Sequence, residues 1–311
     1  RRLMAGERPL LALVGPTASG KTEAGIAVAE RLGAELVSVD SMLVYRGMDV
    51  GTAKPGPAER ARVPHHLLDV AEPEESFSVA RYQRLAREAI EGIEARGRRV
   101  MLVGGSGLYF RAAVDDLEFP GTDPEARGEL EVQAATLGPE RLHERLAGLD
   151  PVAAARIEPS NVRRTVRALE VAAVTGRPMS SYAEAWERYP AERVRAAGVD
   201  VSRDALARRI EARVRAMVEA GFADEVRLLL DRGLLGWLTA GQAIGYAEFA
   251  RHLEGELSLE EAVAQTVKRT RELARRQMVW FRRDPRIRWF AADEHGATAI
   301  VDELTEYLQG D

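Results

Sequence analysis

The sequence predicts an α/β protein in which a parallel sheet is flanked by helices and interrupted by a separate helical insertion. Strands and helices alternate over the first hundred residues. The apolar run Leu10–Val14 leads directly into a glycine-rich segment and then a helix. Strand signals vanish between about residues 116 and 190 and then return.

The first part of the chain is expected to form most of the sheet. Short apolar runs bounded by turn residues predict strands, and apolar residues with a helical period predict helices. In chain order these are a strand at 10–14, a helix at 21–32, a strand at 35–39, a helix at 78–95 and a strand at 99–103. The carboxyl ends of parallel strands meet at one edge, where we expect the functional residues.

The insertion is predicted to consist of short helices. Three of them begin at a residue followed by proline, as helix starts often do: Asp123-Pro124, Gly138-Pro139 and Asp150-Pro151. Asn161 caps a further helix over 162–175. The predicted domains are therefore 1–115 together with 191–311, as the α/β core, and 116–190, as a helical insertion.

The last third is predicted to be mostly helical. A short strand at 199–201 returns the chain to the sheet, and Ser258 with Glu261 forms a capping box that opens a long helix. The predicted elements are helices at 205–220, 223–231, 246–253 and 259–283, a strand at 286–290, and a helix at 297–308.

Composition excludes several classes of protein. A hydrophobic share of 46% with 30% charged residues is that of an ordinary globular protein, and no apolar run approaches the roughly 18 residues of a membrane span. The chain has no cysteine, which rules out disulfides, thiolate zinc sites and a cysteine nucleophile. We therefore expect a cytoplasmic protein that does not enter a membrane.

The charge is unevenly distributed. The net charge is −5, yet the stretch from Lys268 to Arg288 holds nine basic side chains and only two acidic ones. Such a cluster, interleaved with Trp280 and Phe281, is typical of a surface that binds a polyanion.

The glycine-rich segment matches the phosphate-binding P-loop pattern and follows a strand, as that motif requires. It predicts a P-loop NTPase-like core. Its backbone amides and helix N-terminus surround a phosphate, Lys21 neutralises the charge, and the hydroxyl of Thr22 ligates Mg²⁺. The segment comprises Gly15, Pro16, Thr17, Ala18, Ser19, Gly20, Lys21 and Thr22.

Two further features bear on the reaction. Asp40 follows the second strand and so lies at the functional edge, where it serves as a general base or as a metal ligand through water. The third strand ends in Gly104-Gly105, without the acidic residue that often holds the metal of a nucleotide hydrolase. This absence weakens the prediction of an ATPase.

One arginine can be singled out from helical spacing. On the helix at 205–220, Arg213 lies within an arc of about 100° with the apolar residues Ile210, Val214 and Met217. It either snorkels at the margin of the core or points into a site. Arg209, one turn earlier, is a second candidate.

Several ordered motifs resemble those of the tRNA dimethylallyltransferases over nearly the whole chain. They are Asp40-Ser41, the run Val44–Pro55 (VYRGMDVGTAKP), Pro64–Asp69 (PHHLLD), Val103–Tyr109 (VGGSGLY), Asn161–Glu170, Gly241–Tyr246 and the basic stretch Lys268–Trp280. The resemblance implies transfer of a dimethylallyl group from dimethylallyl diphosphate to N6 of adenine 37, beside the anticodon of tRNA. The P-loop would then hold a diphosphate leaving group, with Mg²⁺ as cofactor.

The resemblance also implies roles for individual residues. Asp40 becomes the catalytic base, while Thr22 and Arg213 complete the catalytic set by holding the diphosphate and its metal. The anticodon stem-loop is the expected RNA partner, the insertion 116–190 is expected to contact it, and the protein is expected to be a monomer. Implied contacts with tRNA fall at Asp40, Ser41, Met42, Leu43, Ser106, Arg127, Arg163, Arg164, Thr165, Val166, Arg167, Gln242, Ala243, Ile244, Gly245, Tyr246 and Ala247.

The sequence departs from the family pattern at two places. Ser106 stands where threonine is common, and the run 242–247 has apolar residues where some relatives carry arginine or cysteine. Three alternative functions remain open on the residues alone. They are an adenylate isopentenyltransferase acting on free AMP or ATP, a P-loop kinase or NTPase for small molecules, and an RNA-binding protein with a regulatory nucleotide switch.

Overall fold

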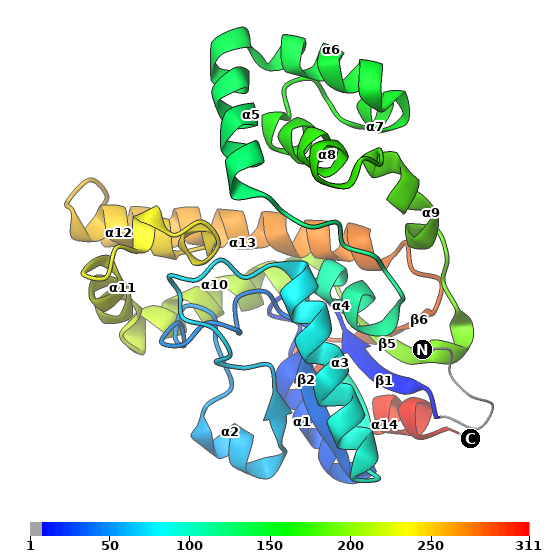
Figure 1. Cartoon of the computed structure of the whole chain (residues 1–311). Helices are drawn as coiled ribbons and strands as arrows, with labels where there is room; N and C mark the ends of the chain where they lie inside the picture. The colour runs from blue at the N-terminus through cyan, green and yellow to red at the C-terminus, as the bar shows by residue number, and fades with distance from the viewer. Residues whose placement is uncertain (1–7, 311) are drawn as a thin grey trace. The chain divides into compact units, whose positions relative to one another are not determined.

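The structure is a computed structural model that describes residues 8–310, apart from the side chain of Glu184. Six parallel strands form one sheet in the order β3-β2-β4-β1-β5-β6. Strands β1, β2, β5 and β6 are labelled in Figure 1. The strands are β1 (Leu10–Val14), β2 (Ala34–Ser38), β3 (His65–His66), β4 (Arg99–Gly104), β5 (Val194–Val201) and β6 (Ile287–Ala292). The predicted fold class, a parallel P-loop-like sheet flanked by helices, is confirmed.

The chain divides into two compact units. One is formed by the chain up to Asp115 and from Pro190 onward, and the other spans Asp116–Tyr189. The helices of the first unit are α1 (Lys21–Leu32), α2 (Pro57–Arg62), α3 (Val79–Ala95), α4 (Gly107–Val114), α10 (Arg203–Glu219), α11 (Phe222–Leu230), α12 (Tyr246–Leu253), α13 (Leu259–Phe281) and α14 (Val301–Gln309). Apolar residues of the sheet, α1 and α14 pack into one core cluster.

The second unit contains five helices among its described residues. They are α5 (Pro124–Leu137), α6 (Pro139–Leu149), α7 (Pro151–Arg156), α8 (Val162–Thr175) and α9 (Ala183–Trp186). Leu130, Leu142, Leu146 and Leu169 belong to a separate apolar cluster in this unit. The residues predicted to start helices do so, since the side chains of Asp123 and Asp150 accept hydrogen bonds from first-turn amides.

Two sequence predictions of element boundaries are corrected. The strand predicted at 199–201 begins five residues earlier, at Val194, because small residues such as Ala196 and Gly198 hide a buried strand. A Cβ on Gly198 would lie 2.7 Å from the ring of Trp289 on the neighbouring strand, so the small residue is required there. The helix predicted at 297–308 starts as a 3₁₀ turn over Gly296–Ile300. The elements α2, β3 and α4 were not predicted.

A buried charge network surrounds Asp115, the residue at which the chain leaves the first unit. Arg286 Nη1 is 2.8 Å from Asp115 Oδ1 and donates to the carbonyl of Pro190 at 3.5 Å, while Arg286 Nη2 lies 2.7 Å from Asp284 Oδ2. Arg111 also pairs with Asp115. This use of Arg286 corrects part of the sequence analysis, because one member of the basic stretch is internal and cannot bind a polyanion.

No helix within residues 8–310 combines the length and the apolar character that crossing a membrane would require.

Candidate active site at the carboxyl edge of the sheet

The P-loop connects the central strand β1 to helix α1. Ala18 and Gly20 have φ angles of 63° and 84°, which turn the backbone tightly between strand and helix. The ammonium group of Lys21 is buried and donates to the carbonyl of Pro16 at 3.1 Å. The loop therefore has the curled backbone and the central lysine that a phosphate cradle needs.

The outer side of the loop is held by the C-terminal part of the chain. Arg209 donates from Nε to the carbonyl of Ala18 at 2.7 Å and from Nη1 to that of Glu294 at 3.1 Å. The amide of Ala297 donates to the carbonyl of Ser19 at 2.8 Å. Arg209, the second candidate for the diphosphate, thus supports the loop backbone in this structure.

A cavity of about 820 Å³ opens at this edge of the sheet. It brings together many of the predicted site residues: Thr17, Lys21, Thr22, Asp40, Ser41, Met42, Leu43, Arg213, Gln242, Ala243 and Ile244. Other predicted residues of the same unit lie outside its lining: Gly15, Pro16, Ala18, Ser19, Gly20, Ser106, Gly245, Tyr246 and Ala247. The helix α10 contributes Ile210, Arg213, Val214 and Met217 together, so the face inferred from helical spacing is the face that lines the cavity.

Asp40 lies just beyond β2 and is fixed by a local turn. Its Oδ1 accepts a hydrogen bond from the amide of Met42 at 2.9 Å, and the residue is only partly buried. A carboxylate held through one oxygen keeps acceptor capacity on the other. Asp40 is therefore able to accept a proton inside the cavity.

The cationic groups of the cavity affect one another. Burial, followed by the nearby Arg213 guanidinium, lowers the pKa of Lys21 to about 8, and the negative charge of Asp40 opposes this shift. Burial also lowers the pKa of Arg213, whose Nη2 donates to the carbonyl of Thr52 at 3.2 Å. Two cations crowded into one partly closed space form a site that favours a multiply charged anion.

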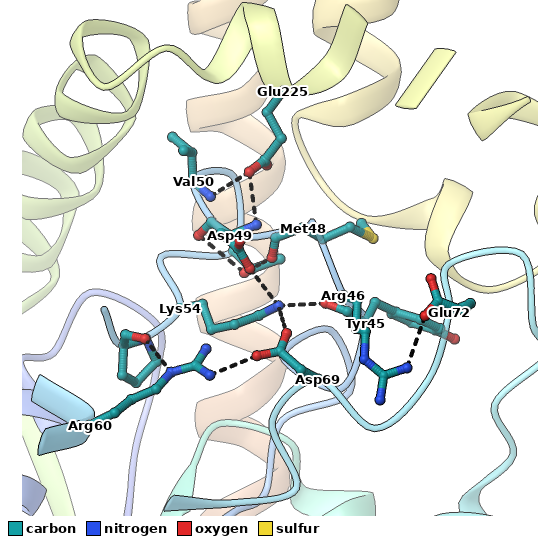
Figure 2. A network of polar contacts seen from close by, with 12 residues as sticks. Tyr45, Arg46, Met48, Asp49, Val50, Lys54, Arg60, Asp69, Glu72 and Glu225 are labelled. Carbon is teal, nitrogen blue, oxygen red and sulfur yellow. Dashed lines mark hydrogen bonds and ion pairs between the residues drawn. The ribbon is translucent and has the colours of Figure 1, made fainter. Parts of the chain in front are cut away.

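The loop that carries Thr52 is held by a buried lysine, shown in Figure 2. The side chain of Lys54 is fully buried, and its Nζ lies 2.7 Å from both Asp49 Oδ1 and Asp69 Oδ1. Arg60 supports Asp69 from the other side at 2.7 Å. Hydrogen bonds from Lys54 and Arg60, together with their charges, hold the pKa of Asp69 below its ordinary value, although burial, the largest single influence, acts the other way.

Glu225 from α11 fixes the tip of the same loop. Its carboxylate accepts hydrogen bonds from the amides of Asp49 and Val50 at 2.8 and 2.7 Å (Figure 2). It also accepts one from the amide of Gly51 at 3.0 Å. Tyr246 donates to the same carboxylate at 2.7 Å. The wall of the cavity formed by Gly51, Thr52, Ala53 and Pro55 is thus supported by these contacts.

Some of the predicted tRNA contacts are corrected by burial. Tyr246 is fully buried beside Phe222, so its side chain supports the loop rather than facing RNA. Thr165 and Val166 lie on the buried face of α8. The family motifs were carried over as continuous runs, whereas successive residues of a helix point about 100° apart, so a continuous run includes buried as well as exposed positions.

In the second unit, Arg127 and Arg167 share one buried partner. Their guanidinium groups each lie 2.8 Å from Glu170 Oε2, and Glu170 also accepts the amide of Asp123 at 2.9 Å. Arg163 and Arg164 are exposed on the same helix. The four arginines implied as tRNA contacts therefore lie on two helices of this unit, α5 and α8.

The residues of the cavity suit a magnesium ion that arrives with phosphate. Among the described residues, no three His, Cys, Asp or Glu side chains gather as a metal site. Thr22 offers a hydroxyl oxygen at the cavity, and Mg²⁺ commonly takes one or two protein oxygens and completes its shell with phosphate and water. His65 and His66 contact Val63 and Glu35 instead.

Sequence reasoning missed three residues that organise the site. Gln277 of α13 accepts the amide of Thr17 at 2.8 Å, and Glu225 and Lys54 hold the loop at residues 49–54. Lys54 lies within the family motif Val44–Pro55, but no sequence pattern indicated its role. Gln277 and Glu225 are far from their partners in sequence, so no local pattern could reveal them.

Comparisons with known proteins give a consistent result. The model of the family described as IPP transferase matches residues 43–284. The tRNA dimethylallyltransferase of Streptomyces coelicolor is 53% identical over 283 residues, covering 91% of this chain and 90% of the relative. That of Desulforudis audaxviator is 50% identical over 289 residues, or 93% of each chain.

Two solved structures also resemble this chain. The full-length tRNA isopentenylpyrophosphate transferase of Bacillus halodurans aligns with a TM-score of 0.68 and 41% identity over 97% of each chain. A eukaryotic dimethylallyltransferase acting on tRNA aligns with a TM-score of 0.77, covering 93% of this chain and 74% of that one, and at 23% identity it supports the fold alone.

Proposed function

Since this chain belongs to the IPP transferase family, we propose that it transfers a dimethylallyl group from dimethylallyl diphosphate to N6 of adenine 37 of tRNA. The chain is a prenyltransferase, and tRNA and dimethylallyl diphosphate are its substrates. One observation supports the proposal most directly. A single cavity contains a P-loop lysine and threonine, a second cation on α10, and a carboxylate beyond β2.

The donor half of the cavity is suited to a leaving diphosphate. Lys21 and Arg213 supply positive charge, and the loop amides and the N-terminus of α1 add oriented dipoles. These groups stabilise the negative charge that develops on oxygen as the carbon–oxygen bond breaks. Mg²⁺, held by Thr22 and the diphosphate oxygens, would supply further charge neutralisation at the same place.

The acceptor half requires a base near the attacking nitrogen. The exocyclic nitrogen of adenine forms the new carbon–nitrogen bond, diphosphate leaves, and the proton lost from the nitrogen passes to Asp40. An adenine stacked in a loop must be turned out of the stack to reach such a cavity. We expect the anticodon stem-loop to be the part of tRNA that is bound, with Arg163 and Arg164 near its phosphates.

The relation to tRNA-modifying enzymes gives no support to the alternatives of a small-molecule kinase or an adenylate isopentenyltransferase. We expect a monomer that acts in the cytoplasm, where its RNA substrate is found.

Incubation with labelled dimethylallyl diphosphate and either tRNA or AMP tests which molecule accepts the dimethylallyl group. Label in tRNA at adenine 37, located by mass spectrometry, is the expected result, and label in AMP alone would refute it.

The role of Asp40 is tested by Asp40→Asn. The amide keeps an oxygen for the amide of Met42 but cannot take a proton, so the loop is preserved while the base is lost. We expect single-turnover transfer to fall about 10²–10⁴-fold while tRNA affinity is nearly unchanged. The exposed Asp231→Asn serves as the matched control. Transfer at the normal rate in Asp40→Asn would remove Asp40 from the reaction.

A further inference from the structure

The guanidinium group of Arg213 is hydrogen-bonded to the main chain of the loop at residues 49–54. Its Nη2 donates to the carbonyl oxygen of Thr52 at 3.2 Å. We propose that Glu225, which lies outside the lining of the cavity, is a positioning residue for the donor diphosphate, because it holds the loop that orients Arg213. The inference rests on the proposed function, in which Arg213 binds that diphosphate.

Arg213 needs a fixed partner because it shares the cavity with a second cation. Lys21 lines the same space, and two positive charges repel each other before an anion arrives. A guanidinium group has five N–H donors in one plane, so a single contact with a carbonyl restricts the direction of the others without exhausting them. The place of the Thr52 carbonyl therefore decides where the remaining donors of Arg213 point.

The direction of this carbonyl is set by the peptide bond between Thr52 and Ala53. The bond is trans, so its C=O and N–H groups point to opposite sides. The amide of Ala53 donates to the carbonyl of Val50 at 3.0 Å. The carbonyl of Thr52 consequently points away from Val50, and it is free to accept Arg213.

Glu225 holds Val50 and its neighbours with both oxygens of its carboxylate. Oε2 accepts the amides of Asp49 and Val50 at 2.8 and 2.7 Å (Figure 2). Oε1 accepts the amide of Gly51 at 3.0 Å and the hydroxyl of Tyr246 at 2.7 Å. Two hydrogen bonds on each oxygen fill the acceptor capacity of a carboxylate. Three successive amides are thus held by one side chain, and its loss would free the whole turn.

Close packing at Gly51 brings the loop within reach of Glu225. A Cβ on this glycine would lie 2.2 Å from the ring of Phe222 and 2.8 Å from that of Tyr246. Phe222 begins α11, the helix that carries Glu225. Because glycine lets the backbone approach these rings, one carboxylate can contact three amides.

Charge and geometry predict opposite effects for removal of this carboxylate. By charge alone, a negative group near the cavity disfavours an anion, so its neutralisation would tighten the binding of pyrophosphate. By position, its loss releases the Thr52 carbonyl and the guanidinium group of Arg213, so the binding of pyrophosphate would weaken. The sign of the change therefore separates the two effects.

The test measures the binding of magnesium pyrophosphate by isothermal titration calorimetry. We expect Glu225→Gln to weaken binding about five- to tenfold, because the new NH₂ group faces amides that need an acceptor. The effect should vanish in an Arg213→Ala background, where no guanidinium group remains to be oriented. Asp224→Asn, an exposed neighbour on α11, is the matched control and should leave the affinity unchanged.

Glu225→Asp keeps the charge and provides a second variant if Glu225→Gln does not fold. Its side chain is one methylene shorter and cannot reach all three amides, so it should weaken binding by a smaller factor, and only when Arg213 is present. Unchanged or tighter binding in the folded variants, or an equal loss in the Arg213→Ala background, overturns the inference and leaves the donor site intact. Normal binding by Arg213→Ala alone, or no binding by the wild-type protein, would refute the proposed donor site as well.

Discussion

At the scale of single residues, the surroundings of Lys21 determine how much positive charge the P-loop carries before a donor binds. An ammonium group that is buried beside Arg213 is costly to charge, and its pKa accordingly falls to about 8. Part of the population is neutral at slightly alkaline pH. An incoming diphosphate favours the protonated form of Lys21. Because it also relieves the repulsion between Lys21 and Arg213, the two cations favour binding of the anion.

The lowered pKa of Lys21 predicts how stability depends on pH. Between pH 8 and the ordinary lysine value of 10.5, the unfolded chain binds more protons at this site than the folded one, so folded stability rises with pH. We expect the wild-type protein to gain up to about 3 kcal/mol relative to Lys21→Met over this range. Urea unfolding of both proteins at several pH values measures the difference. A difference that stays constant would mean that Lys21 titrates normally.

The residues of the site differ in how far sequence could predict them. Lys21 and Thr22 follow from a motif with a strict spacing, and Arg213 follows from the phase of an amphipathic helix. Asp40 follows from its place after a strand. The partners Gln277 and Glu225 could not be predicted, because their contacts arise only when α13 and α11 are packed in three dimensions.

At the scale of secondary structure, helix ends were predicted well and the strand β5 poorly. Caps depend on one residue and its nearest neighbours, so Asn161 and Ser258 define helix starts without reference to the rest of the fold. Strand β5 carries Gly198 at its centre because Ile287 and Trp289 of the neighbouring strand leave no room for a side chain there. That requirement belongs to the sheet, and a single segment does not reveal it.

Helix α8 offers a prediction of its own, because it carries Glu170, the shared partner of Arg127 and Arg167. Loss of this buried charge leaves two partly buried arginines without their carboxylate. After allowance for the solvent exposure of the arginines, we expect Glu170→Gln to destabilise the unit 116–189 by about 2 kcal/mol. Faster hydrogen exchange in this unit, with pyrophosphate affinity unchanged, would confirm the expectation.

Glu131→Gln is the matched control for that experiment, since Glu131 is an exposed residue of the same unit. It should leave hydrogen exchange unaltered. Equal exchange in Glu170→Gln and the wild-type protein would show that the shared carboxylate does not stabilise the unit.

At the scale of the whole molecule, the chain leaves and re-enters the sheet-containing unit at closely placed points. One nitrogen of Arg286 contacts both the carboxylate of Asp115 and the carbonyl of Pro190. The buried ion network thus holds together Asp115 and Pro190, the two residues that flank the inserted segment 116–189. A short connection should be able to replace everything between them.

We therefore predict that exchanging residues 116–189 for a linker of about four glycine and serine residues leaves a folded protein. Pyrophosphate affinity should stay within about threefold of wild type, because every residue lining the cavity belongs to the remaining unit. Affinity for tRNA should fall by about tenfold or more, because the arginines that we propose to bind its phosphates are removed. Calorimetry measures the affinity for pyrophosphate, and gel-shift titration measures the affinity for tRNA. Unchanged tRNA affinity would refute the RNA-binding role of the insertion.

The strand order has a consequence for biosynthesis. Strand β1, which carries the P-loop, lies between β4 and β5, and β5 is translated only after the whole insertion. Until then, one edge of β1 has no hydrogen-bonding partner on the nascent chain. The ribosome must release nearly the entire polypeptide before Gln277 and Ala297 can meet the loop. The donor cradle is consequently among the last parts of the protein to mature, and a truncated chain would expose an open, aggregation-prone strand edge.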